Sequence, residues 1–333
     1  MNQAPAVVRS DPAAERVVSR YANVQAVLAD DRFEVPPATG DGVIGTIAWL
    51  RSSVSRFANG AEHRARRARA EGELQRLDPD RLRRAAHRRA DELLVANRGA
   101  RIDVMARLGR WVPMVTMAAA LGFTDPEDAA RAVIATAAAY FPGANAEAQR
   151  AADVSTAQLV AMSRRAELDV IVARIALMVQ GCDATAGLIG TALHVLQDGD
   201  PQWPTDALLT EVLRHSPPVR ASRRVASIEL VLDGSLVRAG DPVVCSVDAA
   251  NRDPAIFERP DRFDPGRQEK QSLTFGYGVR PCPGAAQALA LAAGVVDAVR
   301  HRCTLLPGTS VEYEPSTALR IPRRLEVAPF SEG

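Results

Sequence analysis

Near its C-terminal end the chain reads Phe275-Gly276-Tyr277-Gly278-Val279-Arg280-Pro281-Cys282-Pro283-Gly284. The two inner glycines allow backbone angles and a close approach that a Cβ atom would forbid. Gly284 lies where this loop meets an Ala- and Leu-rich stretch, which we expect to be a helix from about Ala285 to Arg302. The sulfur of Cys282 should therefore lie at the positive end of that helix, where a thiolate is stabilised. Such a loop presents one thiolate rigidly, as a metal ligand requires.

A buried structural cysteine in a Gly-rich turn is the alternative interpretation of Cys282. The run, however, fills every fixed position of the pattern Phe-Gly-x-Gly-x-(His/Arg)-x-Cys-x-Gly. In this stretch the chain resembles the cytochrome P450 family, in which that pattern forms the haem-binding loop. The resemblance implies haem b (iron protoporphyrin IX) as the cofactor and Cys282 as its axial iron ligand. It also implies a haem pocket that includes Phe275, Gly276 and Gly284, and a contact from Arg280 to a haem propionate.

Charge and cysteine spacing exclude several classes of protein. The 333 residues include 41 basic and 40 acidic side chains, a balance that argues against a nucleic-acid binder. The four cysteines form no C-x-x-C pair, and no Cys/His spacing suits a structural zinc site. Met1 to Glu15 holds no apolar core of a signal peptide, and the longest apolar stretch, Trp111 to Phe123, is far below the ~18 residues of a membrane helix. We therefore expect a soluble, cytoplasmic protein with reduced thiols and no membrane contact.

Periodicity predicts a mainly α-helical chain. From about Arg81 to Gln197 apolar residues recur at three- and four-residue spacing. Two long helices are expected, Arg101–Leu121 and Glu167–Gln197, and a further helix should end at Pro217-Pro218. Two short strands, Arg224–Leu232 and Leu236–Val247, should flank a turn at Asp233-Gly234. Residues Asp253–Arg267 should form an irregular but fixed segment.

This order of elements also resembles a bacterial cytochrome P450, from about Arg20 to Phe330. Tyr21-Ala22-Asn23-Val24 is similar to the family's opening segment, and Asn251-Arg252-Asp253-Pro254 to the stretch before the haem loop. The resemblance implies a mainly α (α+β) fold with small β-sheets, in which haem lies between a long distal helix and the Cys-bearing loop. We expect a single haem-thiolate domain over residues 1–333, unusually short, with a shortened N-terminal region and a shortened substrate roof at about 124–165.

Glu211-Val212-Leu213-Arg214 places a carboxylate and a guanidinium on one face of a helix. Alone, such a pair is a commonplace surface salt bridge that contributes under ~1 kcal/mol. In the family that the chain resembles, the pair joins an arginine of a downstream segment, here Pro260-Asp261-Arg262-Phe263, in a buried network that supports the haem loop. The resemblance therefore implies a structural role for Glu211, Arg214 and Arg262.

Buried propionates need cations or hydrogen-bond donors. His63 and Arg67 lie four residues apart, hence on one helix face, and they match the family's propionate-binding pair. Arg224 and Arg280 fill the other two positions that the resemblance implies. His63 taken alone would be interpreted as a solvated histidine.

The second long helix contains Gln180-Gly181-Cys182-Asp183-Ala184-Thr185, where the family usually has Ala-Gly-x-(Glu/Asp)-Thr across the iron. A glycine costs roughly 1 kcal/mol in a helix interior relative to alanine, and close approach to haem and oxygen would explain Gly181. Asp183 matches the family's acid, which guides protons. Ala184, however, replaces the threonine whose hydroxyl helps to deliver them. Thr185 is a poor substitute, because one residue turns a helix by about 100°.

Gln180 lies four residues before Ala184 and therefore on the same helix face. We hypothesise that its amide partly takes the space and the hydrogen-bonding role of the missing hydroxyl. The alternative is sequence drift in an enzyme whose substrate, or water, serves instead.

Only 57 residues separate Phe123 from Gly181, where the family usually has many more. That segment ordinarily carries the two helices of the roof over the substrate, and here it includes the turn signal Tyr140-Phe141-Pro142-Gly143-Ala144-Asn145. We expect a reduced lid, giving a more open pocket or one completed by a partner. By the resemblance, substrate contacts come from Phe33–Ala58, Val219–Ser222, Val179–Thr185 and Thr317–Leu319.

Residues Arg64 to Arg89 hold ten arginines against four acidic residues, a local net charge of +6. In the family this region lies partly on the face nearest the thiolate, where an acidic ferredoxin would be steered by charge. The alternative is a solvated, arginine-rich helix surface. Because no flavin or nicotinamide domain fits in the remaining chain, electrons are expected from a separate ferredoxin and ferredoxin reductase, or else the oxidant is peroxide.

These observations and the resemblance predict a cytochrome P450-type monooxygenase. It would oxidise a small organic molecule, in specialised metabolism such as natural product biosynthesis, with O2 and two electrons. Because Ala184 replaces threonine, the alternatives are an enzyme that uses peroxide, couples radicals or rearranges its substrate without inserting oxygen. A different class is a non-catalytic haem-binding or recruitment domain, against which the retention of Cys282, His63, Arg67 and Arg224 argues.

Overall fold

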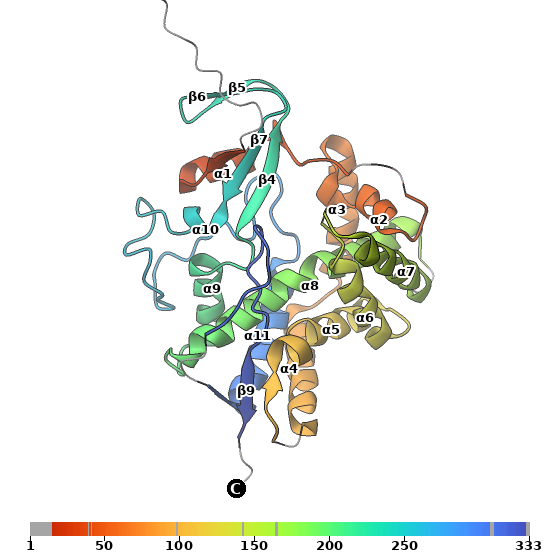
Figure 1. The fold of residues 1–333 in the computed structure, drawn as a ribbon, viewed down its shortest axis with the longest axis vertical. Coiled ribbons are helices and arrows are strands. Elements are labelled where there is room, and N and C mark those ends of the chain that lie inside the picture. Colours follow the sequence, from red (N-terminus) through yellow and green to blue (C-terminus); the bar gives the residue numbers. More distant parts are fainter. Residues whose placement is uncertain are drawn as a thin grey trace, which may run out of the picture.

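The computed structural model describes residues 15–38, 40, 42–97, 99–141, 143–163, 166–306 and 310–330. Helices dominate and the sheets are small, as predicted (Figure 1). The α-helices are α1 (Tyr21–Ala29), α2 (Ile47–Ser53), α3 (Gly60–Gln75), α4 (Pro79–Ala96), α5 (Trp111–Leu121), α6 (Pro126–Ala137), α7 (Ala146–Met162), α8 (Leu168–Gln197), α9 (Thr205–His215), α10 (Val247–Ala250) and α11 (Ala285–Arg302). Two shorter helical turns are η1 (Ser55–Phe57), a 3₁₀ turn, and η2 (Met105–Gly109), a π-helical turn.

Helix α8 runs through the middle of the molecule and organises the rest of the fold (Figure 1). Its apolar side chains are buried on most sides, where it packs against α3, α5, α6, α9 and α11. By length and composition alone, an 18-residue stretch of α8 is apolar enough to cross a membrane, although 56% of that stretch is buried inside the protein. The longest apolar stretch expected from the sequence was Trp111 to Phe123, whereas the buried helix α8 is the core of the fold.

Helices α4, α5, α8 and α11 form the centre of the helical layer. Helix α11 packs closely against α4. The absence of a side chain at Gly294 allows this, since a Cβ atom there would lie 2.3 Å from the carbonyl oxygen of Arg83. The bounds of α11 and the C-terminal end of α8 are those predicted from periodicity. Both helices are buried along an apolar face, and this is why their pattern was readable.

The predicted helix Arg101–Leu121 is wrong at its first three residues, and the rest is not one continuous α-helix. Strand β3 (Ile102–Asp103) comes first, η2 follows, and only then does α5 begin. Asp103 explains the interruption, since its Oδ1 accepts hydrogen bonds from the N–H groups of Met105 at 3.0 Å and Leu325 at 3.2 Å. The strand pairs with β9 (Glu326–Pro329), so a tertiary contact overrides the local helical preference.

Three small sheets complete the described part of the fold. The largest has the strand order β1-β7-β4-β2, in which β1 is parallel to β7 and the other pairs are antiparallel. The second has the order β3-β9-β8, and the third is the hairpin β5-β6. The bounds are β1 Arg16–Val18, β2 Phe33–Glu34, β4 Ala221–Ala226, β5 Leu230–Leu232, β6 Ser235–Val237, β7 Pro242–Ser246 and β8 Cys303–Leu305.

Each of the two strands predicted after Pro218 is divided in the structure. Arg224–Leu232 corresponds to the end of β4 and to β5, and Leu236–Val247 to β6 and β7. The predicted turn is present, with φ angles of 52° at Asp233 and 69° at Gly234. These left-handed conformations are those that a two-residue hairpin turn requires.

Residues 124–163, within the segment expected to form a reduced roof, fold into α6 and α7, which pack on each other. Both helices begin at capping side chains: Asp125 accepts the N–H groups of Glu127 and Asp128, and Asn145 accepts that of Ala148. Tyr140 and Phe141 lie in the turn after α6; Pro142 of the predicted turn lies outside the described residues. Helix α7 also anchors the start of α2, because Asp153 accepts the N–H of Ile47 at 2.8 Å.

Candidate functional site

A cavity of about 640 Å³ lies between α8, α3, β4 and the loop that precedes α11. All the residues predicted to ligate metal, to bind the cofactor or to act in catalysis border this cavity: His63, Arg67, Gln180, Gly181, Asp183, Ala184, Thr185, Arg224, Phe275, Gly276, Arg280, Cys282 and Gly284. Parts of the segments expected to contact substrate border it as well, namely Ser53–Arg56, Val219, Ala221–Ser222 and Ala318–Leu319. The fold thus brings together residues from five distant parts of the sequence.

The loop that carries Cys282 is held by its backbone. Gly278 has a φ of 64°, and a Cβ atom there would lie 2.3 Å from the Cα atom of Ala29. The N–H of Cys282 donates to the carbonyl oxygen of Phe275 at 2.6 Å. Because all four cysteines lie in described segments and the other three are buried, Cys282 is the one whose sulfur is accessible. Its access is to the cavity that it borders.

The surroundings of the Cys282 sulfur match the predicted helix-end position. Gly284 caps the N-terminus of α11, and its N–H donates to the sulfur. Burial raises the pKa of the Cys282 thiol above its ordinary value, while the Gly284 N–H and the Arg67 guanidinium lower it. A coordinated metal cation would hold this thiol as a thiolate.

One histidine and three arginines gather at one side of the cavity. His63 is 8% exposed, and its pKa is lowered to about 4 by burial and by the neighbouring guanidinium groups of Arg280 and Arg67. Arg280 is held by the Ala58 carbonyl oxygen at 2.9 Å and by Asn59 Oδ1 at 2.7 Å. Arg224 is buried, bonds Ser222 Oγ at 2.7 Å, and has a pKa lowered to about 10, chiefly by burial.

This cationic cluster fits a ligand with two carboxylates. Among the described residues, Arg224 and Arg280 form no salt bridge with a carboxylate, whereas Arg67 pairs with Glu71 at 2.7 Å. Buried cations that repel one another need anions from outside the chain. The two propionates of haem would supply them beside the sulfur of Cys282, so the residues present fit the implied cofactor.

On the opposite wall, α8 offers open space where a flat group could lie. A Cβ atom built on Gly181 would meet nothing within 4 Å. Gln180 is exposed and forms no hydrogen bond with any described residue, and Ala184 borders the cavity beside it. Thr185 is among the residues that border the cavity, although it is only 3% exposed.

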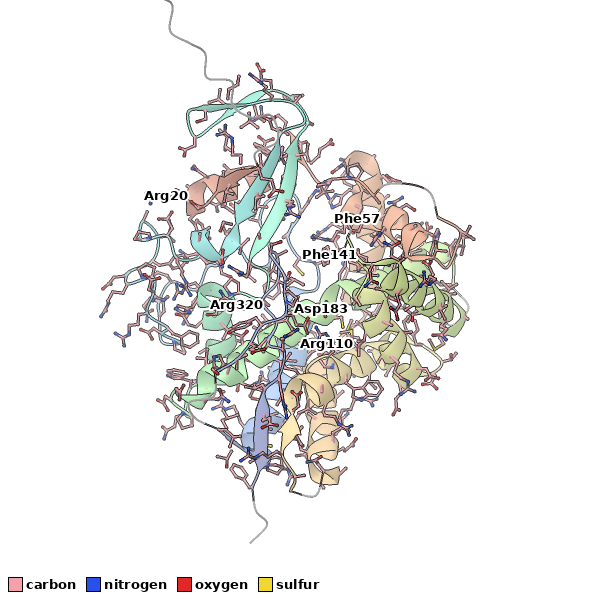
Figure 2. The ribbon with its side chains drawn as sticks, in the orientation of Figure 1. Arg20, Phe57, Arg110, Phe141, Asp183 and Arg320 are labelled. Carbon is pink, nitrogen blue, oxygen red and sulfur yellow. The ribbon has the colours of Figure 1, made fainter. Side chains whose placement is uncertain are left out.

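Asp183 is bound to partners that the sequence did not reveal. Arg110 Nε donates to Asp183 Oδ1 at 2.7 Å, and Arg110 Nη2 donates to both carboxylate oxygens of Glu314 at 2.8 and 2.9 Å. The two carboxylates raise the pKa of Arg110 above its ordinary value despite burial. Figure 2 shows Arg110 and Asp183 side by side near the middle of α8. The guanidinium of Arg110 therefore links Asp183 of α8 to Glu314 in the C-terminal segment.

The predicted structural pair is buried and hydrogen-bonded, but its third member is not Arg262. Arg214 is 1% exposed and donates to both oxygens of Glu211 at 2.9 and 2.7 Å. The second cation is Arg267, whose Nε lies 3.6 Å from Glu211 Oε1. Arg262 is exposed and contributes only its carbonyl oxygen, which accepts from Arg214 at 3.1 Å. Because the segment turns after Phe263, the guanidinium of Arg267 and not that of Arg262 returns to the network.

Comparison with known proteins agrees with this geometry. The family model described as "Cytochrome P450" matches residues 204–299. Cytochrome P450 165C4 of Amycolatopsis orientalis is 36% identical over 122 residues, which are 34% of this chain and 30% of that protein. The cytochrome P450 monooxygenase PikC of Streptomyces venezuelae is 28% identical over 265 residues, 70% of this chain and 62% of that protein. The chain thus spans less than two thirds of either curated relative.

The similarity of fold extends further than the similarity of sequence. The crystal structure of P450BioI in complex with an acyl carrier protein that carries hexadec-9Z-enoic acid matches with a TM-score of 0.81. The match covers 94% of this chain and 92% of that chain, at 22% sequence identity.

Proposed function

The chain belongs to the cytochrome P450 family, whose cofactor is haem, and on that premise we propose that it is a haem-thiolate monooxygenase of specialised metabolism. It would oxidise a small organic molecule in the cytoplasm with dioxygen and two electrons from a separate protein. The observation that carries the proposal is the cavity itself, in which the one exposed cysteine lies opposite α8 and beside Arg224 and Arg280, which form no salt bridge with a described carboxylate. When bound, haem supplies the redox chemistry, and a thiolate ligand favours cleavage of the oxygen–oxygen bond.

The chain's own residues orient the cofactor in this scheme. Cys282 would ligate the iron from the loop before α11, and His63, Arg67, Arg224 and Arg280 would hold the two propionates. The buried network of Glu211, Arg214 and Arg267 would keep the loop in place from behind, because it ties α9 to the segment that leads into the loop. Such preorganisation fixes the metal ligand before the reaction begins.

On the distal side we assign proton movement to Asp183. Its carboxylate borders the cavity while one oxygen is bound by Arg110, so the acid has both a proton site and a fixed orientation. Since Glu314 binds the same guanidinium, Arg110 keeps a partner when Asp183 releases it. Asp183 would then pass a proton from solvent toward the cavity.

Gln180 is the second distal residue of the proposal. Its amide is exposed at the cavity beside Ala184, and it would replace the hydroxyl that the family usually places there. The double variant Gln180→Ala with Ala184→Thr should change the fraction of electrons lost as peroxide. If the fraction of electrons lost as peroxide stays the same while a substrate is turned over, Gln180 has no role in proton delivery. Thr185, the substrate or water would then supply the missing hydroxyl's hydrogen bond.

For electron supply we propose an acidic ferredoxin that docks on α3 and α4. Several arginines of these helices are already paired within the chain, such as Arg66 with Glu62 at 2.5 Å and Arg83 with Asp206 and Asp297, both at 2.8 Å. Arg64, Arg84 and Arg88 are exposed and form no salt bridge with a described residue. These three charges are therefore free for a partner.

The decisive experiment is the ferrous–carbon monoxide spectrum of the purified, haem-loaded protein, followed by a ligand-shift screen. The proposal expects the red-shifted band typical of thiolate haem, and NAD(P)H-dependent turnover with ferredoxin and reductase. Turnover with hydrogen peroxide alone would favour a peroxide-using enzyme. A protein that binds haem without this band, or binds none, would instead support a non-catalytic role.

A further inference from the structure

One part of the cavity has an aromatic wall. Trp49, Tyr140 and Phe141 border the cavity, and the ring of Phe57 packs against that of Tyr140. The ring centroids of Tyr140 and Phe57 are 5.5 Å apart, and those of Tyr140 and Phe141 are 5.6 Å apart in an edge-to-face arrangement. An aromatic wall of this kind favours the edge or face of another ring.

The wall is held in place from outside the cavity by Arg51. Its guanidinium donates to the carbonyl oxygens of Tyr140 at 2.9 Å and Phe141 at 3.0 Å, and to that of Ala139 as well. Three successive carbonyl groups of the turn are thus fixed by one side chain of α2. A wall fixed before binding loses little conformational entropy when a ligand arrives.

Arg56 adds a positive charge to this wall. It borders the cavity, is exposed, and its Cζ atom lies 5.4 Å from the centroid of the Phe141 ring. Among the described residues it forms no salt bridge, and its charge contributes to the lowered pKa values of Arg224 and Arg280. His63, Arg67, Arg224 and Arg280 already suffice for two haem propionates, so Arg56 is a cation without an assigned anion.

Tyr140 is a buried member of this wall. Its side chain is 1% exposed, and its hydroxyl forms no hydrogen bond with any described residue. Burial raises the pKa of this hydroxyl, so it stays protonated. The hydroxyl atom is itself buried and does not open onto the cavity, so Tyr140 contributes a fixed ring to the wall and no polar contact to a ligand.

We propose that this wall is the subsite for an aromatic carboxylate. The guanidinium of Arg56 would bind the carboxylate, and the ring would lie against Trp49 and Phe141. This inference rests on the proposed function, because it places the substrate in the cavity that holds haem. It also assigns a substrate class, small aryl acids, which membership of the family does not specify.

The test is the affinity of the haem-loaded protein for matched probes, measured by spectral titration and by calorimetry. 3-Phenylpropionate should bind about tenfold more tightly than its methyl ester or 3-cyclohexylpropionate. Arg56→Gln should weaken binding of the acid about tenfold without affecting the ester, and Arg56→Lys should restore part of the loss. Tyr140→Phe should leave this affinity unchanged, because the hydroxyl of Tyr140 does not open onto the cavity.

Arg66 provides a matched control. It borders the same cavity, but it is paired with Glu62 and donates to the Val54 carbonyl oxygen at 3.2 Å, so Arg66→Gln should leave the affinity for the acid unchanged. Equal affinity for acid and ester in the wild-type protein would overturn the proposal. So would loss of haem from Arg56→Gln, because Arg56 would then be a propionate ligand.

The ferrous–carbon monoxide band distinguishes a failure of the aryl acid subsite from a failure of the proposed monooxygenase. A normal band in the wild-type protein and in all variants, together with equal binding of acid and ester, would refute the aryl acid subsite alone. Absence of the band from the wild-type protein would instead refute the monooxygenase.

Discussion

The cavity has a thiolate side, around Cys282, and a distal side, around Asp183 of α8. These two sides are held in place by different means. Around Cys282 the restraints are backbone groups within ten residues: the φ of 64° at Gly278, the 2.6 Å bond to Phe275, and the N–H of Gly284. Around Asp183 they are side chains from afar, since Arg110 is 73 residues from Asp183 and 204 from Glu314. The thiolate side is therefore a rigid local motif, while the distal side depends on contacts that single substitutions can retune.

The largest expected effect comes from the thiolate side. Cys282→Ala removes the accessible sulfur of the cavity, so the ferrous–carbon monoxide complex should lack the red-shifted band and turnover should cease. The measurement is the absorption spectrum of the reconstituted protein. Cys303→Ala is the control, because Cys303 begins β8, does not border the cavity, and its removal should leave the band intact. Persistence of the band in Cys282→Ala would place the ligand elsewhere.

A smaller effect is expected on the distal side, where the cofactor stays bound. Asp183→Asn keeps the shape but removes the proton site, so turnover should fall about 100-fold, with a larger solvent isotope effect. Glu314→Gln should lower turnover less, because it leaves Arg110 bound more strongly to Asp183. Single-turnover kinetics in H2O and D2O would measure both.

Asp169 gives a matched comparison for this distal prediction. It also lies on α8 and borders the cavity, yet its partner is Arg69 at 3.6 Å near the cavity edge. Asp169→Asn should keep turnover within about twofold of the wild-type protein. If Asp183→Asn behaved in the same way, proton delivery would not pass through Asp183.

The support beneath the thiolate loop allows a third comparison, between two arginines of one segment. Arg267 is buried against Glu211 and donates to the carbonyl oxygens of Glu258 at 2.7 Å and Arg262 at 3.1 Å. Arg267→Gln should therefore lower the free energy of unfolding by about 1–3 kcal/mol. Arg262→Gln should change it by less than about 0.5 kcal/mol, because that side chain is exposed. Urea denaturation of both variants checks this, and the reverse order would restore Arg262 to the network.

The contrast between local restraints and contacts from distant parts of the sequence explains how much of the site could be predicted from the sequence. The Cys282 loop, α11 and the pair His63 and Arg67 depend on spacings of a few residues, which helix geometry and turn chemistry make readable. Arg110 and Arg267 were missed because no periodicity links them to Asp183 or Glu211; only the folded topology does. Arg56 lies in the segment expected to contact substrate, but its position over Phe141 could not be read from the sequence. The family motif pointed to Arg262, and a turn of five residues moved that role to Arg267.

The smallest effect concerns His63, whose environment differs with and without the cofactor. In the haem-free fold its pKa is lowered to about 4, so between that value and its ordinary value of about 6.5 the unfolded chain binds the extra proton. Stability of the haem-free protein should thus fall as pH decreases through this window, by on the order of 1–2 kcal/mol. His63→Gln should remove this part of the dependence in urea denaturation between pH 7 and 4.5. Bound haem should also weaken this pH dependence, since propionates beside His63 raise its pKa. If the free energy of unfolding changes equally with pH in the haem-free and haem-loaded proteins, the propionates lie elsewhere.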